Sequence, residues 1–313
     1  MTPSRTSTAP KASLPSLPLS AWRDTKDTLH LYLQIIGKVR MAKMPRQNHW
    51  WHVPLYVSEC GFTTRPVPDE DRLFTIDVDV LSPEVRITST DGSRRSFGLS
   101  DGLTVAAFYD NLMGALADLE IDGDIHPEPY DHPTSTTPFP DDVVHASFDA
   151  RAVETYWRIL TRIQPVFQRF RGRFYGKSTP VHLFWHSFDL AHTRFSGRNA
   201  PAMDDAAGEV ARDAYSHEVI SFGFWAGDES TPEPAFYAYL YPEPDGLRRT
   251  ALAPDDATWV EQKNGSLAVY PYASMADAAD PDEALLTFLE TAYRACADHA
   301  GWDRDRFATP YAA

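Results

Sequence analysis

The chain has 313 residues, 43% of them hydrophobic and 23% charged, as expected for a globular protein of one large or two ordinary domains. Its formal charge of −15 makes nucleic acid and anionic membranes poor partners, because both require a basic surface. The two cysteines fit neither a disulfide framework nor a metal motif, and no apolar segment is long enough for a bilayer, so we expect a cytoplasmic protein.

The first half of the chain reads as a helix, a set of strands and a second helix. Residues 1–19 are rich in Ser, Thr, Pro and Ala, which predicts a disordered tail. Apolar residues at helical spacing predict a helix over 19–44, ended by Pro45. The segment "HWWHVPLYV" at 49–57 is rich in β-formers and predicts an edge strand or bulge. "LFTIDVDVL" alternates cleanly, and the Asp91-Gly92 turn joins two further strands in a meander.

The same order then recurs. A helix is expected over 103–119, followed by a loop rich in Pro, and another helix over 149–174. "VHLFWHSFDLAHTRF" predicts one long strand or a bent pair, and 198–213 predicts a loop. Four further strands follow, with Asn264-Gly265 as a hairpin turn, and a closing helix runs over 285–299.

These elements predict an α+β protein of two similar halves, each an antiparallel sheet flanked by helices. The N-terminal half covers 20–145 and the C-terminal half 146–313, which we expect to form one body. The repeated order suggests an internal duplication, although the hypothesis depends on element order more than on identical residues. Two such sheets would leave a cleft between them, and clefts of that kind often bind ligands.

Histidines are the first candidates for chemistry. His182 and His186 would share a metal on a helix, but on the predicted strand they lie about 13 Å apart. A metal site would therefore have to combine His49 or His52, His182 or His186, and His217 with Glu218, which together suit a divalent transition metal. The alternative is that these imidazoles are partly buried and bonded to backbone carbonyls.

A second group of candidates lies in "FDLAHTRFSGR". Asp189, Arg194 and Arg198 occur in an otherwise apolar and aromatic run, where a carboxylate needs a partner. They could form a structural ion pair. Alternatively, Arg194 and Arg198 bind an anionic substrate and Asp189 orients it or transfers a proton.

Aromatic runs supply the third group. Tyr237, Tyr239 and Tyr241 alternate in "AFYAYLY", so three phenols share one face of a strand. Trp50 and Trp225 lie in similar runs. Such a face is either exposed to solvent or forms the wall of a pocket for an organic ligand.

The blocks "NHWWHVPLYV", "FDLAHTRFSGR", "YSHEVISFGFW" and "PEPAFYAYLYPEP" resemble an uncharacterised family of bacterial proteins catalogued as a domain of unknown function. The resemblance runs from about Trp22 to about Trp302. It implies no established activity, cofactor or catalytic residue.

Three functions follow from the residues. The first is a small-molecule enzyme with a cleft site, in which His217, Glu218 and Asp189 are catalytic. In it, Arg194, Arg198, Trp50, Trp225 and Tyr239 bind substrate, and a divalent transition metal is held by His49, His52 and His217. The second is a binding protein without chemistry, and the third is an acidic scaffold. An enzyme should bring His217, Glu218 and one of His49 and His52 within about 5 Å of each other.

Overall fold

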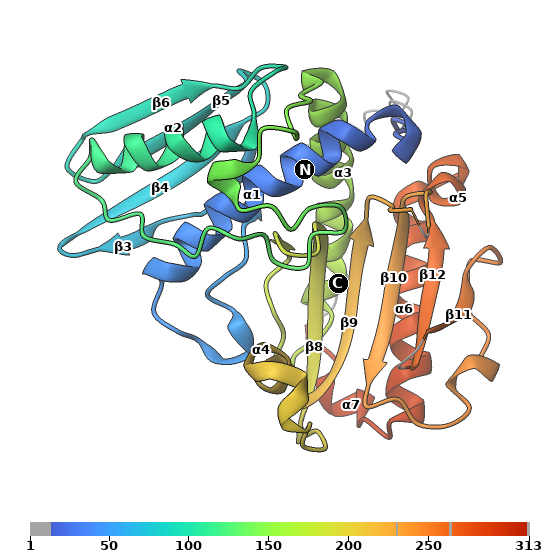
Figure 1. The fold of residues 1–313 in the computed structure, drawn as a ribbon. Helices are drawn as coiled ribbons and strands as arrows, with labels where there is room; N and C mark the ends of the chain where they lie inside the picture. The colour runs from blue at the N-terminus through green and yellow to red at the C-terminus, as the bar shows by residue number, and fades with distance from the viewer. Residues whose placement is uncertain (1–13, 230, 263–264, 312–313) are drawn as a thin grey trace, which may run out of the picture.

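The computed structural model describes residues 14–229, 231–262 and 265–311 as an α+β protein with two antiparallel sheets (Figure 1). The first sheet is ordered β1-β2-β4-β5-β6, with β3 also paired to β4. Its strands are β1 (Tyr56–Val57), β2 (Gly61–Thr63), β3 (Val67–Asp69), β4 (Arg72–Asp79), β5 (Glu84–Ser89) and β6 (Arg94–Gly98).

The second sheet is ordered β11-β12-β10-β9-β8-β7. Its strands are β7 (His182–Phe184), β8 (Asp189–Asn199), β9 (His217–Trp225), β10 (Ala235–Tyr241), β11 (Thr258–Gln262) and β12 (Gly265–Pro271). The described helices are α1 (Arg23–Lys43), α2 (Val105–Ala117), α3 (Ala150–Gly172), α4 (Gly208–Ala214), α5 (Tyr272–Asp277), α6 (Pro281–His299) and α7 (Arg304–Phe307). Five 3-10 turns, η1 to η5, lie between them, and η2 (Asn48–Trp50) bears on the site below.

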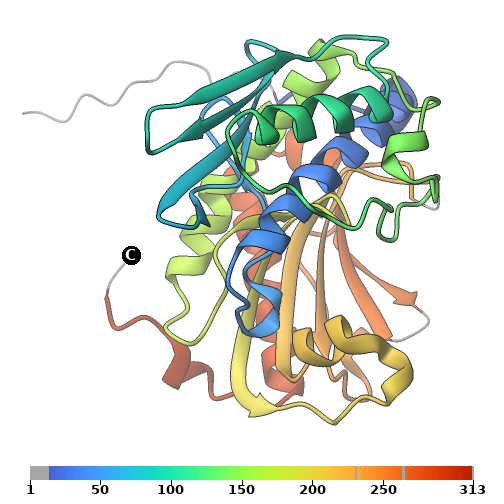
Figure 2. The same ribbon diagram turned by 60° about the vertical axis from the view of Figure 1, so that its left-hand side comes forward.

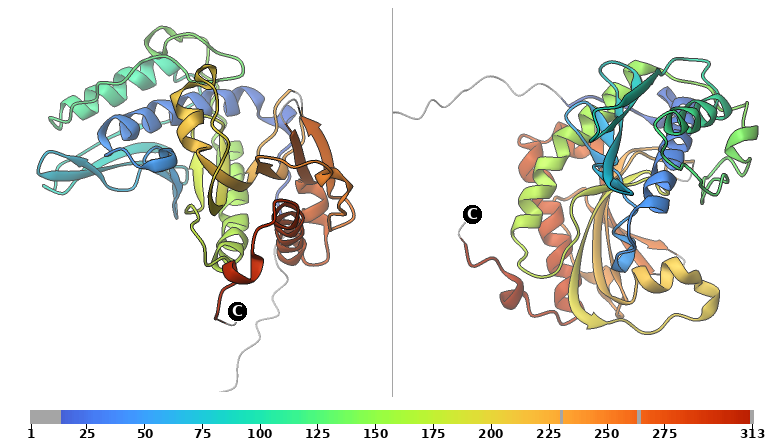
Figure 3. Two further views of the ribbon diagram at one scale, coloured as in Figure 1. Left: turned by 90° about the horizontal axis from the view of Figure 1, so that it is seen from below. Right: turned by 90° about the vertical axis from the view of Figure 1, so that its left-hand side faces the viewer.

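Each sheet has a face covered by long helices. Helices α1 and α2 lie over one face of the first sheet, where the alternating side chains of β4 are buried (Figure 2). Helices α3 and α6 lie over one face of the second sheet, and the short helix α4 lies in front of the other face (Figure 3). None of the described helices is long and apolar enough to cross a membrane.

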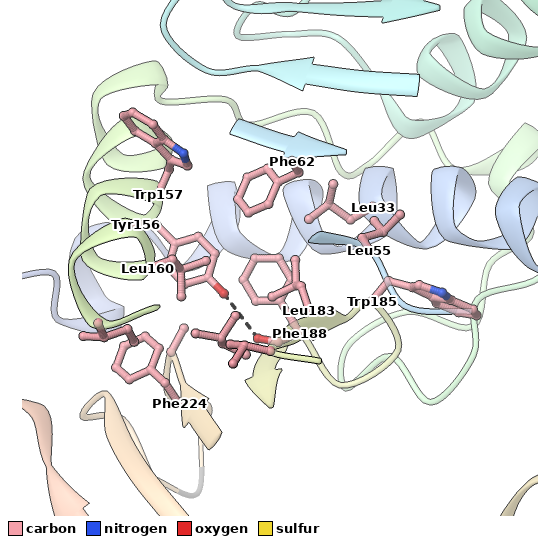
Figure 4. Packing of buried hydrophobic residues seen from close by; sticks show 14 of the residues in the cluster. Leu33, Leu55, Phe62, Tyr156, Trp157, Leu160, Leu183, Trp185, Phe188 and Phe224 are labelled. Carbon is pink, nitrogen blue, oxygen red and sulfur yellow. Dashed lines mark hydrogen bonds between the residues drawn. The ribbon is translucent and has the colours of Figure 1, made fainter. Parts of the chain in front are cut away.

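The two halves share one hydrophobic core. Leu55 and Leu183 exchange both backbone hydrogen bonds, at 2.9 and 2.8 Å, which joins the segment before β1 to β7. Around this junction Phe62 of β2 lies close to Tyr156 of α3, with ring centroids 6.2 Å apart (Figure 4). The core therefore sits between the halves as well as within them.

Most predicted elements are present, with three corrections. The segment 49–57 is not a strand over most of its length. η2 and a turn occupy it, because His49 and Trp50 have φ values of 56° and 60°, which lie outside the β region. The segment 198–213 includes α4 and is not only a loop. Of the two alternatives predicted for 181–195, the structure has the bent pair, β7 and β8.

The predicted tail is the third correction. Residues 1–13 lie outside the described residues, but 14–19 are packed against the protein. Leu17 and Leu19 are buried, and the Pro15 carbonyl accepts a hydrogen bond of 2.8 Å from the Tyr272 hydroxyl. The predicted Asn264-Gly265 turn also falls partly outside the described residues. The Asp91-Gly92 turn joins β5 to β6 as expected, with φ of 88° at Gly92.

Candidate functional site

A cavity of about 1000 Å³ lies over the face of the second sheet that α3 and α6 leave uncovered. Strands β8, β9 and β10 form its floor, η2 and α4 form its roof, and α1 and the β7–β8 turn close its side. Aromatic rings form much of its wall: Trp50, Trp51, Phe184, Trp185, Phe195, Tyr215, Trp225, Tyr237 and Tyr239. A shallower depression beside α3 is lined only by exposed and half-buried residues.

Strand alternation determines which side chains reach the cavity. Along β8, Asp189, Ala191 and Thr193 line it, while the residues between them face α3 and α6. Asp189 pairs across the ladder with Trp225 of β9, which also lines the cavity. The carboxylate and the indole are therefore neighbours on the same face.

A single glycine allows Tyr237 to reach Asp189. Gly223 of β9 lies between Ala191 of β8 and Tyr237 of β10 in the ladder. A Cβ placed on Gly223 would lie 2.4 Å from the Tyr237 hydroxyl oxygen, so the phenol ring extends across β9 in the space that the glycine leaves. The Tyr237 hydroxyl then donates a hydrogen bond to Asp189 Oδ2. A glycine inside a strand signals such a close approach, and this signal was available in "FGFW".

The next row of the floor is also polar. Tyr239 shares a hydrogen bond of 2.9 Å with the Tyr215 hydroxyl, and Thr193 Oγ1 lies 2.8 Å from Ser221 Oγ. Burial raises the pKa of Tyr237 and Tyr239 well above the usual value, and the nearby Asp189 charge raises that of Tyr237 further. Both phenols therefore stay protonated and available as donors at neutral pH.

The β7–β8 turn presents two more polar residues. Ser187 donates its hydroxyl hydrogen to Asp189 Oδ1, and His186 Nε2 lies 3.5 Å from the same hydroxyl. The turn ends at Phe188, a buried residue with φ of 57°. Non-glycine residues with such φ values are uncommon and are often held in place at functional sites. His49 and Trp50 show the same feature in the roof.

The roof is anchored through His49. Its Nδ1 donates to the Asp213 carbonyl oxygen at 3.1 Å, which leaves Nε2 to accept from Lys177 Nζ at 2.7 Å. Burial and the Lys177 charge both lower the pKa of His49. The His217 ring lies edge-on to His49 with centroids 5.1 Å apart. Two of the predicted residues, His49 and His217, are therefore brought together.

His52 and Trp50 form a second part of the roof. Their rings stack with centroids 5.3 Å apart, and Arg46 lies 5.2 Å over the Trp50 ring. Arg46 Nη1 also binds Glu209 of α4 at 2.5 Å, so the segment that leads into η2 is linked to α4 across the cavity mouth. Burial lowers the pKa of His52, and the charge of Arg46 contributes.

Glu218 and Arg198 do not join the other site residues. Neighbours in a strand point to opposite faces, so Glu218 faces away from His217. Its carboxylate accepts from Arg198 Nη2 at 2.7 Å and from the Trp302 indole at 3.1 Å. Arg198 also binds the carbonyls after α6, which indicates a structural ion pair that ties the end of the second sheet to the C-terminal segment.

Arg194 is likewise directed away from the cavity. Its side chain is 1% exposed, donates to the Phe170 carbonyl oxygen of α3 at 2.5 Å, and lies over the Phe170 and Tyr293 rings at 3.5 and 4.3 Å. Burial among these rings lowers its pKa to about 9. The three predicted residues Asp189, Arg194 and Arg198 are therefore separated, with only Asp189 in the cavity.

The predicted metal set is not assembled either. Within the described ranges, no group of three or more His, Cys, Asp or Glu side chains is placed to hold a metal ion. His49 already faces the ammonium of Lys177, and His52 Nδ1 accepts from the Gln47 amide at 3.3 Å. Of the predicted binding residues, Trp50, Trp225 and Tyr239 do line the cavity. Sequence reasoning did not select Ser187, which also lines the cavity.

Comparison with known proteins gives a family and no function. A family model described as "Family of unknown function (DUF5996)" matches residues 14–309, in agreement with the resemblance in the sequence. No curated protein and no solved structure matches the chain significantly.

Proposed function

Since the chain belongs to the family of unknown function DUF5996, we propose from the geometry of its cavity that it binds a small organic molecule over the second sheet. The main support is the arrangement at the cavity floor. There the nearly buried Asp189 carboxylate accepts hydrogen bonds from the Ser187 and Tyr237 hydroxyls and is surrounded by aromatic rings. Small-molecule sites combine an apolar, concave wall with a few fixed polar groups in this way.

The distribution of the candidate residues favours binding over the His/Glu/Arg enzyme expected from the sequence. Glu218 pairs with Arg198, and Arg194 binds the Phe170 carbonyl oxygen. The rings of His49 and His217 lie together, but Glu218, the carboxylate expected beside them, faces away. The acidic scaffold has less support, because a scaffold does not need an aromatic-walled cavity of about 1000 Å³.

An enzyme remains the second candidate, for one specific reason. Asp189 accepts directly from two hydroxyls, so it could receive a proton from a ligand hydroxyl or amine that displaces one of them. Turnover would appear as a mass change of the bound molecule over time, and Asp189→Asn would remove turnover while retaining measurable binding.

The proposed compartment is the cytoplasm. Both cysteines are free, with Cys60 half-buried and Cys296 buried, which supports a reducing environment.

The binding proposal is tested by thermal unfolding in the presence of a library of small metabolites. A ligand at one hundred times its Kd should stabilise the folded chain by about 2.7 kcal/mol, which is a shift of several degrees. The matched variants are Ala211→Trp, which fills the cavity from α4, and Ala117→Trp, which adds the same ring at an exposed position of α2. Ala211→Trp should abolish the shift and Ala117→Trp should keep it. Shifts that survive Ala211→Trp would contradict the proposal.

A further inference from the structure

Resting on the proposed function, we propose that the ligand of the cavity is an organic amine, whose ammonium group pairs with Asp189 while its apolar body lies among the aromatic rings. The negative charge of Asp189 at the cavity floor, and the groups that surround it, favour this class of ligand.

Asp189 is a carboxylate without a cationic partner. Its side chain lines the cavity although the residue is only 6% exposed, and both oxygens accept from uncharged hydroxyls, those of Ser187 and Tyr237. Among the described residues, no Lys, Arg or His forms an ion pair with it within 4 Å. Burying a carboxylate is costly unless a charge compensates it, so an ammonium ligand would gain from this position.

The nearest histidine does not supply that charge. The Asp189 carboxylate favours protonation of His186, but burial is the larger influence and lowers the pKa of His186. The ring is therefore neutral at pH 7 and leaves the carboxylate charge uncompensated.

The carboxylate retains capacity for a ligand. Each carboxylate oxygen can accept two hydrogen bonds, and the two hydroxyls use one on each. The donors are held in place, since Tyr237 is fixed across Gly223 and Ser187 lies in the β7–β8 turn. An ammonium group could thus bind Asp189 without displacing either hydroxyl.

The surrounding rings suit a cation as well. Trp225 is the cross-strand neighbour of Asp189, and the Tyr237 ring extends toward the same carboxylate. Indole and phenol faces attract ammonium groups through their quadrupoles. The overall charge of −15 adds a field that attracts cations and disfavours anions.

Two basic residues, Lys38 and Arg46, also line the cavity and would favour an anionic ligand instead. Arg46 is paired with Glu209 at 2.5 Å, and burial lowers the pKa of Lys38. Lys38 belongs to α1, which closes the side of the cavity, and Arg46 to the segment that follows α1. An acidic ligand would depend on them, so the experiment includes an anionic probe.

The test uses three probes that share one ring system and differ in charge: 2-(2-naphthyl)ethylamine, 2-(2-naphthyl)ethanol and 2-naphthylacetate. Binding to the full chain is measured by isothermal titration calorimetry at pH 7. We expect the amine to bind at least about tenfold more tightly than the alcohol, since a charge-assisted contact contributes about that factor, and the carboxylate to bind most weakly. Asp189→Asn should bring amine and alcohol within about threefold. Glu154→Gln, which changes a carboxylate of α3 that pairs with Arg158 and does not line the cavity, should preserve the preference.

The outcomes separate this inference from the proposed function. Equal or tighter binding of the alcohol or the carboxylate would overturn the amine assignment and leave a small-molecule site intact. Absence of binding by all three probes at millimolar concentration would count against both. The preference of the unmodified chain decides the question even if Asp189→Asn fails to fold.

Discussion

At the residue scale, Gly223 determines where Tyr237 lies and hence how Asp189 is held. We predict that Gly223→Ala displaces the Tyr237 hydroxyl from Asp189, because the added Cβ would overlap the ring at 2.4 Å. Without the Tyr237 hydrogen bond, the Asp189 carboxylate is no longer held in place for a ligand. Ligand affinity should therefore fall at least about tenfold. The measurements are calorimetric binding and near-ultraviolet circular dichroism of the tyrosines.

The matched control is Gly98→Ala in β6. This is also a strand glycine, but a Cβ there would come no closer than 4.0 Å to another atom, the Pro83 carbonyl oxygen. It should leave binding unchanged. If Gly223→Ala bound ligand as well as the original chain, the close approach of Tyr237 would not matter for the site.

Buried histidines should make the stability of the protein sensitive to acid. Burial lowers the pKa of His132 to about 4, whereas the unfolded value is near 6.5. Below pH 6.5 the unfolded chain binds a proton there that the folded chain does not, so stability falls as pH drops from 6.5 to about 4. The loss from this group is about 3 kcal/mol at most.

The variant His132→Asn tests this pH dependence. The asparagine oxygen can replace Nδ1, which accepts from the Thr134 and Ser135 amides at 3.3 and 3.2 Å. Denaturant unfolding at pH 7 and pH 4 should show a smaller loss of stability for His132→Asn than for the original chain. The exposed His126→Asn serves as control and should follow the original chain. Identical pH dependence in all three would show that His132 does not contribute.

At the element scale, regular strands were predictable and the roof of the cavity was not. The alternation in β4 is local, and Phe74, Ile76 and Val78 are buried as it predicts. The conformation of η2 instead depends on distant partners, since His49 is held by Asp213 and Lys177. Local propensity cannot contain that information, and it therefore favoured a strand.

The same reasoning explains which site residues were found. A charged residue in an apolar run identified Asp189, which lines the cavity. The same pattern also selected Arg194, which points to the opposite face of β8. The parity of residues in β8 separates the two, although it does not say which face is open. That depends on α3 and α6, whose packing joins segments far apart in the sequence.

The conformation of η2 gives a prediction at the same scale. His49 has φ of 56° and ψ of 23°, a region that asparagine tolerates and that β-branched residues avoid. We expect His49→Val to be about 1–2 kcal/mol less stable than His49→Asn in denaturant unfolding. The paired control is Gln47, an exposed residue with φ of −121°, where Val should be no worse than Asn. Equal stability of the two His49 variants would contradict the strained turn.

At the scale of the whole molecule, the halves recur in element order but differ in strand order. The first sheet is a simple meander apart from β3, whereas β12 lies between β10 and β11 in the second. Internal duplication therefore stays a hypothesis. What the halves share physically is their core, since Phe188 of the second half lies against His30 of α1 with ring centroids 5.1 Å apart.

A shared core predicts that the protein unfolds as one unit. Removing residues 20–145 would expose Leu183 and Phe188, which are 0% and 1% exposed, and would leave the Leu183 backbone without its partner Leu55. We expect far-ultraviolet circular dichroism and tryptophan fluorescence to give one coincident transition in denaturant for the full chain. We expect the fragment 146–313 to lack a cooperative transition. Two separated transitions, or a fragment with native near-ultraviolet signal, would mean that each half is stable by itself. In that case the cavity, which takes α1 and η2 from the first half and its floor and α4 from the second, would lie at an interface between two domains.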